Sequence, residues 1–216
     1  MPAPTEIGIE ELVEWTQRLR LENSAESRRA HELREMSVDT RLASRLERLA
    51  GIRPTEGREA LLDASLGAAV SLFGADFGNI QRVHRGQGLE IVAQHGFEDA
   101  FLNYFAYVRD TSTPCGVALR AGELLCVPDV AASELFQGTE ALERLLAAQV
   151  RAVTCMPLVS GRGEVVGMLS VHYKSPRNQS AREQARMRVL AKAVGEGTAL
   201  RHDLGQCLAL SAHLAV

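Results

Sequence analysis

The sequence predicts an α+β fold, in which a central antiparallel β-sheet has helices on both faces and helical extensions at both ends. Two segments, 151–159 and 164–173, are rich in β-branched residues and flank a turn at 160–163 that contains two glycines. Both segments carry apolar side chains at odd and even positions, which is typical of strands covered on both faces. Helical and strand-like segments alternate along the rest of the chain.

This predicted hairpin contains few polar residues and one proline. Pro157 supplies no N–H to a neighbouring strand, so we expect its strand to be bulged or to lie on an edge at that point. The polar exceptions are Thr154, Ser170 and His172. We therefore expect any function of the sheet to lie near these three side chains.

The N-terminal region is predicted to be helical. Apolar residues recur at helical spacing over 12–19 and 42–49. Asp39 is a candidate N-cap for the second helix, which Gly51 and Pro54 end. Three regions are predicted along the chain: an N-terminal helical extension (1–54), a globular domain (55–178) and a C-terminal helix (179–216) that packs on the sheet and continues past it.

Between these ends, the elements follow from local periodicity and from turn residues. In chain order they are a helix over 61–73 ended by Gly74, strands over 76–83 and 89–95, a helix over 99–108, a helical turn from Cys115, a strand over 124–127 and a helix over 139–148. From Ser180 the chain is helical again. The pair Gly195 and Gly197 predicts a break in that last helix, because glycine is a poor helix former.

The composition excludes several classes of function. The 216 residues are 46% hydrophobic, which is sufficient for one core. A net charge of -3 and a pI of about 6.1 provide no electrostatic footprint for nucleic acid. No apolar run approaches the roughly 20 residues that cross a bilayer, and we see no signal-peptide segment. We therefore expect a cytoplasmic protein without a nucleic-acid or membrane partner.

Four cysteines are scattered without C-x-x-C spacing, at positions 115, 126, 155 and 207. This distribution favours a reducing compartment over a disulfide framework. It also lacks the ligand spacing of a zinc site, so we predict no metal.

Several short motifs, taken in order, resemble those of GAF domains. They are the runs 74–81 and 93–97, Cys115-Gly116-x-Ala118-Leu119, Val127-Pro128-Asp129-Val130, Met156-Pro157-Leu158 and Gly167-Met168-Leu169-Ser170. The match covers about Glu56 to Pro176. The resemblance implies a five- or six-stranded antiparallel sheet with the two helices from the chain ends on one face. It implies a small-ligand pocket under loops and short helices on the other face.

The candidate pocket residues follow from side-chain alternation together with this resemblance. Side chains two apart on a strand share a face, as Ser170 and His172 do, and the long helices require the opposite face for their apolar contacts. The candidate ligand-binding set is Asn79, Gln81, Phe97, Phe101, Phe105, Cys115, Asp129, Phe136, Ser170 and His172. The phenylalanines are equally consistent with ordinary core. Asp129 fits a turn carboxylate that accepts backbone N–H bonds better than it fits a ligand contact.

An enzymatic alternative is the GAF-type reductase of free methionine sulfoxide. Cys115 corresponds to one cysteine of that family and Cys126 lies near the position of a second. The loop 131–140, where the family has its nucleophile, contains no cysteine. The family's substrate-holding carboxylates would fall near Val153, Ser170 and His172, none of which is an acid. We therefore predict a non-enzymatic protein with no catalytic residue, in which Cys115 and Cys126 are small buried apolar residues.

A photosensor is the second alternative, and no cofactor is predicted. Phytochrome-like GAF domains attach bilin through a cysteine that is followed by histidine, at positions resembling 138–145 here. This segment has neither residue. A lone histidine on a strand, such as His172, is more often structural than a haem ligand.

The C-terminal segment 200–208 is similar to the H-box of sensor histidine kinases. There, a helical histidine followed by an acid accepts phosphate, and His202-Asp203 matches that pair. His202 is thus a candidate phosphoacceptor, and a solvated helix face is the alternative. No ATP-binding domain follows His202, so we expect no kinase activity from the chain alone.

Taken together, these features predict a sensory GAF module that binds a small ligand. We expect a homodimer formed by the terminal helices, because these carry more apolar surface than one sheet face covers. We also expect a signalling partner in a two-component setting.

Overall fold

The structure is a computed structural model that describes residues 39–84, 88–108 and 113–214, with side chains for all of these except Pro54, Val108 and 202–214. The chain divides into two compact units, Met1–Thr40 and Arg41–Val216, and the second contains the sheet. The predicted helical segment over 12–19 lies outside the described residues.

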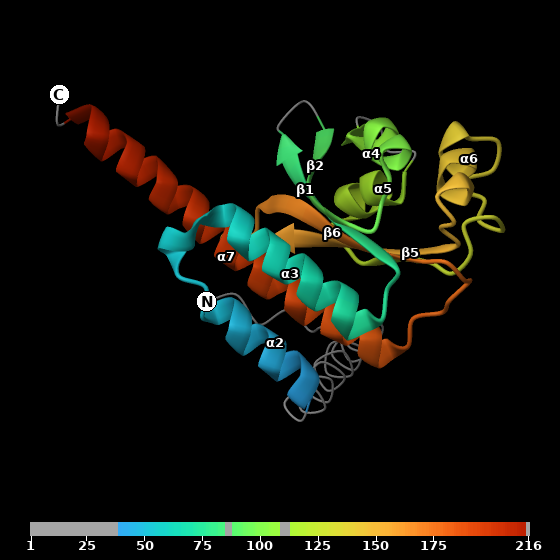
Figure 1. The fold of residues 1–216 in the computed structure, drawn as a ribbon, viewed down its shortest axis with the longest axis horizontal. Helices are drawn as coiled ribbons and strands as arrows, with labels where there is room; N and C mark the ends of the chain where they lie inside the picture. Colours follow the sequence, from blue (N-terminus) through green and yellow to red (C-terminus); the bar gives the residue numbers. More distant parts are fainter. Residues whose placement is uncertain (1–38, 85–87, 109–112, 215–216) are drawn as a thin grey trace, which may run out of the picture. The chain divides into compact units, whose positions relative to one another are not determined.

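The core of this unit is a six-stranded antiparallel sheet, as predicted, with the order β3-β2-β1-β6-β5-β4 (Figure 1). Its strands are β1 (Phe77–His84), β2 (Gly88–His95), β3 (Tyr107–Val108), β4 (Leu125–Val127), β5 (Ala152–Val159) and β6 (Val165–Tyr173). The central pair, β1 and β6, joins the predicted hairpin of β5 and β6 to the two predicted strands that form β1 and β2. A helix over 99–108 was expected, and its end is wrong: it stops at Phe105, and Tyr107–Val108 pair with β2.

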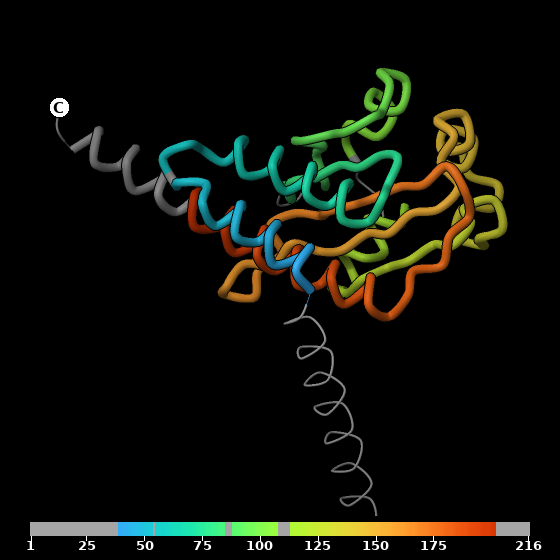
Figure 2. The backbone as a smooth tube through the Cα atoms, turned by 60° about the horizontal axis from the view of Figure 1, so that its bottom comes forward, coloured from blue at the N-terminus to red at the C-terminus, as the bar shows by residue number. Residues whose placement is uncertain are grey.

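Helices cover both faces of the sheet. They are α2 (Thr40–Ala50), the 3₁₀ turn η1 (Pro54–Glu56), α3 (Gly57–Phe73), α4 (Asp99–Phe105), α5 (Pro114–Ala121), α6 (Glu140–Ala147) and α7 (Ala181–Leu214). The two long helices α3 and α7 lie side by side on one face, and α4, α5 and α6 lie beyond the other (Figures 1 and 2). Hereafter these are called the helix face and the loop face.

Pro157 lies where β5 has a strand on one side only. β4 pairs with β5 over Val153–Cys155, so its ladder ends before Pro157. On the other side Pro157 pairs with Met168 of β6, and that register shifts two residues later. At Pro157, β5 therefore has a neighbour on one side only, in line with the expectation of an edge position, where a residue without an N–H is tolerated.

The predicted break in the last helix is wrong. α7 runs without interruption from Ala181 to Leu214. A Cβ on Gly195 would lie 2.4 Å from the carbonyl oxygen of Val159, and one on Gly197 would lie 3.0 Å from Leu61 Cδ2. The two glycines therefore allow α7 to pack closely on β5 and α3, and they do not end the helix.

Candidate functional site

The strand register arranges the predicted polar residues in rows across three neighbouring strands. Residues paired directly in antiparallel strands point to the same face of the sheet. Along β1, β6 and β5 the rows are Phe77, His172 and Val153; Asn79, Ser170 and Cys155; and Gln81, Met168 and Pro157. Four of the ten predicted ligand-binding residues thus meet on one surface.

Ring contacts and one sulfur contact show that this surface is the loop face. The imidazole of His172 lies edge-on to Phe97 and Phe101, with ring centroids 5.0 and 6.1 Å away. Cys115 Sγ, from α5, lies 3.4 Å from Ser170 Oγ. The polar set faces away from α3 and α7, as the alternation of side chains predicted.

Three side chains of these rows have polar atoms without a protein partner. Asn79 Oδ1, Gln81 Oε1 and both ring nitrogens of His172 make no hydrogen bond to any part of the chain that the structure describes. The residues are only 3%, 2% and 4% exposed. A buried polar atom without a partner costs about 1–3 kcal/mol, so three such groups in one place require an explanation.

His172 is held in its neutral form. Burial lowers the pKa of the imidazole to about 3, because the charged form loses its hydration without gaining a partner. The neutral ring offers one donor and one acceptor, whose assignment to Nδ1 and Nε2 depends on the tautomer. Its surroundings therefore suit a hydrogen-bonding ligand better than an anion.

The pKa of His172 predicts how stability changes with pH. In the unfolded chain an imidazole takes up a proton near pH 6.5, whereas the folded protein resists protonation down to about pH 3. Stability is therefore lost progressively as the pH falls through this window. We expect His172→Leu to remove this loss, so that its stability relative to wild type rises by roughly 1 kcal/mol per pH unit below 6.5. Urea unfolding at pH 7 and pH 5 measures the difference, and parallel losses in both proteins would contradict the prediction.

An aromatic wall covers the polar rows. Phe97 stacks on Phe101 at 3.7 Å and on Phe77 at 5.0 Å, and Phe105 lies 4.5 Å from Phe101. Phe136 is fully buried in the same apolar cluster. The predicted phenylalanines thus all belong to the core of the loop face, and two of them, Phe97 and Phe101, lie beside His172.

The outer side of this wall opens into a cleft between α4 and α6 with a volume of about 280 Å³. Phe77, Phe97 and Phe101 line it together with Gln149 and Lys174. Gln149 adopts a left-handed conformation (φ 60°) at the end of α6, where glycine is usual. The wall therefore separates the buried polar groups from a surface cleft by the thickness of one layer of rings.

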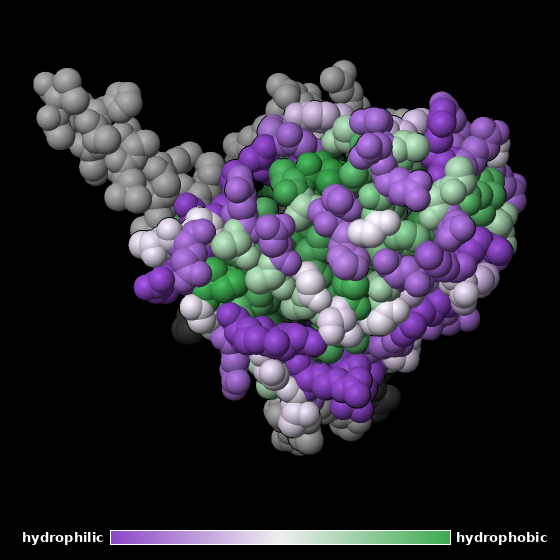
Figure 3. Space-filling model, viewed as in Figure 1, coloured by the Kyte–Doolittle hydropathy of each residue, from purple (hydrophilic) through white to green (hydrophobic). Residues whose placement is uncertain are grey.

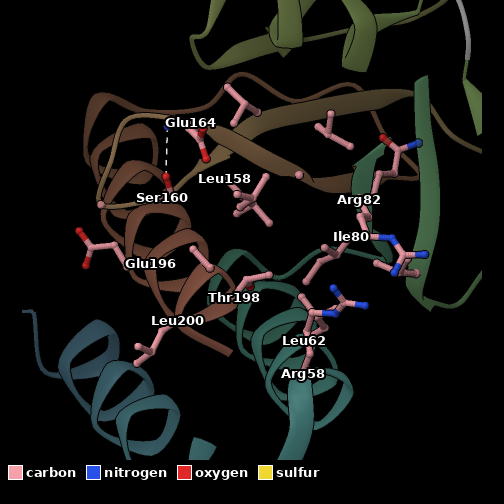
Figure 4. Close-up of a pocket in the computed structure, with 18 of the residues that line it drawn as sticks. Arg58, Leu62, Ile80, Arg82, Leu158, Ser160, Glu164, Glu196, Thr198 and Leu200 are labelled. Atoms are coloured by element: carbon pink, nitrogen blue, oxygen red, sulfur yellow. Dashed lines mark hydrogen bonds between the residues drawn. The ribbon is translucent and has the colours of Figure 1, made fainter. Parts of the chain in front are cut away.

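A second pocket, of about 400 Å³, lies on the helix face, and the sequence did not predict it. In Figure 4, Leu62 of α3, Ile80 of β1 and Leu158 of β5 surround it, with charged side chains at its rim. Figure 3 shows apolar surface interrupted by hydrophilic side chains on the side of the molecule drawn in Figure 1. This pocket is larger than the α4–α6 cleft, and Gln81 is one of its lining residues. Gln81 pairs with Met168, which belongs to the apolar cluster of the loop face, and the side chains of His172 and Ser170 also point to that side of the sheet.

Asp129 lies apart from the polar rows and is engaged by its own neighbours. Its carboxylate accepts two hydrogen bonds from Arg151 Nη2, at 2.9 and 3.1 Å, and one from the backbone N–H of Ala131. The hydrogen bonds from Arg151 hold the pKa of Asp129 below its ordinary value. The turn role considered for this residue fits these contacts.

The cysteines are divided between the two faces. Cys115 and Cys155 meet on the loop face with their sulfurs 3.4 Å apart. Cys126 is the register partner of Thr154 on β5. Adjacent residues of a strand point to opposite faces, so Thr154 and Cys126 face α7 while Cys155 faces the loop side. Cys126 therefore does not meet Cys115. Cys126 is also partly exposed, which corrects the expectation that it is buried.

Two kinds of feature are absent from the described part of the chain. Among the residues whose side chains the structure describes, which end at Arg201, no three His, Cys, Asp or Glu side chains gather as metal ligands would. Within residues 39–84, 88–108 and 113–214, no helix combines the length and the apolar character that crossing a bilayer requires.

Comparison with known proteins gives one family match and many structural matches. The family model described as "GAF domain" matches residues 57–196. A GAF domain of a phosphoenolpyruvate-protein phosphotransferase from Coxiella burnetii is 14% identical, with a TM-score of 0.64 over 79% of this chain and 98% of that one. No curated protein matches the sequence.

Two further solved structures differ in function. Free methionine-R-sulfoxide reductase from Neisseria meningitidis is 18% identical, with a TM-score of 0.61 over 76% of this chain and 89% of that one. A phycoerythrobilin-bound GAF domain from a cyanobacterial phytochrome is 21% identical, with a TM-score of 0.60 over 76% and 98%. At such identities the similarity shows a common fold, which serves several functions.

Proposed function

The chain belongs to the GAF domain family, and on that basis we propose that it is a non-enzymatic sensory module that binds a small polar ligand on the loop face. The observation that carries this proposal is the set of buried, unpartnered atoms on Asn79, Gln81 and His172. Pockets for small molecules combine apolar walls with a few converging polar groups, and the phenylalanine wall over these atoms supplies the apolar part.

The chemistry of these groups indicates the class of ligand. Asn79 Oδ1 and Gln81 Oε1 are acceptors, so they require N–H or O–H donors from the ligand. His172 is neutral and adds one donor and one acceptor. A small uncharged molecule with at least two donors and one acceptor fits this set.

Strand β6 connects the proposed ligand site to the flanking helices. His172 faces the loop side, whereas Val171 faces α3 and α7 and is fully buried. At the end of β6, the Tyr173 hydroxyl accepts a hydrogen bond of 2.7 Å from Gln179 Nε2, two residues before α7 begins. A ligand that displaces β6 therefore changes the support of α7, which is the proposed route of the signal.

A reductase activity is not favoured by the positions of the thiols. Cys115 and Cys126 are on opposite faces, and the rows around His172 contain no carboxylate for a substrate amino group. The similarity to the Neisseria enzyme concerns the fold. We therefore propose binding without catalysis.

Two leucine variants test the proposed site. We expect Gln81→Leu and His172→Leu to weaken ligand binding by about 5- to 150-fold, which corresponds to one lost hydrogen bond of roughly 1–3 kcal/mol. Gln81 Oε1 and both ring nitrogens of His172 make no hydrogen bond within the protein, so their removal breaks none. We therefore expect the free energy of unfolding of both variants at pH 7 to be no lower than that of wild type. Native mass spectrometry of the purified protein identifies a retained molecule, and calorimetry measures its affinity.

Thr154→Val is the matched control for these variants. Thr154 is a buried polar residue on β5 that pairs with Val171 and so faces the helices. We expect its affinity to stay within about twofold of wild type, since it lies on the other side of the sheet. A ligand bound equally well by wild type, Gln81→Leu and His172→Leu would refute the proposed site.

The remaining parts of the proposal concern assembly and setting. We propose a homodimer through the terminal helices, for which the 53% exposure of Leu200 on α7 is one support, and light scattering is the test.

His202 lies within α7 and remains a candidate phosphoacceptor for a two-component partner. An acid-labile phosphate that is lost in His202→Ala would test that role. Three free thiols in the described residues fit a cytoplasmic location.

A further inference from the structure

A pair of thiols beside the ligand site has no part in the proposed function. Cys115, in the first turn of α5, and Cys155, in β5, are 40 residues apart in the sequence, and their sulfurs are 3.4 Å apart. Both residues are free and buried. We propose that Cys115 and Cys155 form an oxidisable dithiol, which closes reversibly to an intramolecular disulfide when a peroxide reaches it.

The geometry requires only a small movement. A disulfide has an S–S bond of about 2.05 Å, so the two sulfurs must approach by roughly 1.3 Å. The elements that carry them already pack together, since α5 lies against β5. The start of α5 is fixed as well, because Thr113 Oγ1 accepts a hydrogen bond of 3.2 Å from the N–H of Gly116. The thiols are therefore held near bonding distance by two ordered elements.

The two thiols are not equivalent. Cys115 is 8% exposed and Cys155 is fully buried, so an oxidant meets Cys115 first. The hydrogen bond from the Cys155 thiol lowers the pKa of Cys115, and the same contact together with burial raises the pKa of Cys155. The thiolate is the reactive form of cysteine. Cys115 is therefore the attacking thiol, and Cys155 resolves the product.

The proposed reaction has two steps and a peroxide as the oxidant. In the first, Cys115 Sγ attacks one peroxide oxygen: an S–O bond forms, the O–O bond breaks, and the other oxygen leaves as water or an alcohol after taking up a proton. In the second, Cys155 Sγ attacks the sulfenic sulfur. The S–S bond forms, the S–O bond breaks, and the departing hydroxide takes the Cys155 proton to give water. The two thiols lose two electrons to the peroxide.

Closure of the disulfide would change the polar rows. In the reduced protein, Ser170 Oγ lies 3.4 Å from Cys115 Sγ, and either atom can be the donor. A disulfide has no S–H, so it can no longer donate to Ser170, and the hydrogen bonding of this hydroxyl within the row must change. Asn79, the register partner of Ser170, carries an unpartnered acceptor. The redox state would thus alter the ligand site, a consequence that rests on the proposed function, whereas the disulfide itself does not.

A variant with two cysteines removed tests the disulfide. Cys126→Ser with Cys207→Ser leaves Cys115 and Cys155 as the only thiols of the chain. Trypsin separates them, because Cys115 lies in the peptide 110–120 and Cys155 in the peptide 152–162. After treatment with hydrogen peroxide, we expect both alkylatable thiols to be lost and the two peptides to be linked, and dithiothreitol should restore both thiols.

A matched control has the same number of thiols in a different arrangement. Cys155→Ser with Cys207→Ser leaves Cys115 and Cys126, which lie on opposite faces of the sheet. We expect no linked peptide from this variant under the same conditions. Two results from the variant that retains Cys115 and Cys155 would overturn the proposal. One is that both thiols stay alkylatable after peroxide treatment, and the other is that Cys115 is oxidised to sulfinic acid without a linked peptide. Circular dichroism verifies that both variants are folded.

The coupling to the ligand site is measured separately. The peptide experiment contains no ligand, so its result does not depend on the proposed function. Native mass spectra of the reduced and oxidised forms compare the occupancy of the molecule that copurifies with the protein. Unequal occupancy supports the coupling, and equal occupancy overturns the coupling alone.

Discussion

Gly195→Ala is expected to lower the free energy of unfolding by about 3 kcal/mol or more, or to prevent folding. The added Cβ would lie 2.4 Å from the carbonyl oxygen and 2.6 Å from the nitrogen of Val159. Both atoms belong to the backbone of β5, so no side chain can turn away to make room. Overpacking in a core costs typically 1–3 kcal/mol even where side chains can adjust. Here α7 or β5 must move, and urea unfolding measures the loss.

Two other glycines serve as matched controls for this substitution. Gly67, in the middle of α3, has nothing within 4 Å of its Cβ position, so Gly67→Ala should be neutral or stabilising by up to about 1 kcal/mol. Gly197→Ala would meet Leu61 Cδ2 at 3.0 Å, and a flexible side chain can yield, so an intermediate loss is expected. Equal stabilities of the Gly67 and Gly195 variants would show that the close approach of α7 to β5 is not required.

Phe136→Ala is expected to cost about 3–5 kcal/mol of stability, the range for a large aromatic residue removed from a core. Phe136 is fully buried and belongs to the apolar cluster of the loop face. Its carbonyl accepts a hydrogen bond of 2.8 Å from Thr139 Oγ1, and Thr139 caps α6. The residue therefore links the loop after β4 to the helix that borders the cleft. Thermal and urea unfolding quantify the loss.

The same variant decides between two roles of the phenylalanine. A core residue lowers stability when it is truncated, whereas a ligand wall lowers affinity with little effect on the fold. Phe136→Leu should lose less than half as much as Phe136→Ala, because it retains most of the apolar volume. Leu146→Ala, at a position 40% exposed on α6, should change stability by less than about 1 kcal/mol. A Phe136→Ala protein as stable as wild type would exclude the core role.

Much of the sheet could be predicted because its strands are specified locally. β-branched residues, glycines in turns and the alternation of side chains are properties of neighbouring positions. Alternation also placed Ser170 and His172 on the loop face, since a strand has a period of two. The same reasoning failed for Tyr107–Val108, because a strand of two residues has no internal pattern and is formed only by its pairing with Leu89–Glu90.

The contacts of two glycines and two cysteines could not be predicted from local sequence patterns. From propensity alone, Gly195 and Gly197 predict a break in a helix, and only the contact with Val159 shows that they permit close packing. The sequence indicated scattered thiols, and nothing in their spacing indicated that Cys115 meets Cys155.

By itself, then, the sequence determined the family, the alternation of helices and strands, and the side of the sheet on which the polar residues lie. The tertiary structure decided which of them meet. The register of β1, β6 and β5 sets Asn79 beside Ser170 and Ser170 beside Cys155. Such registers depend on contacts between segments far apart in the chain, whose free energies come from burial and pairing and are not encoded at any one position.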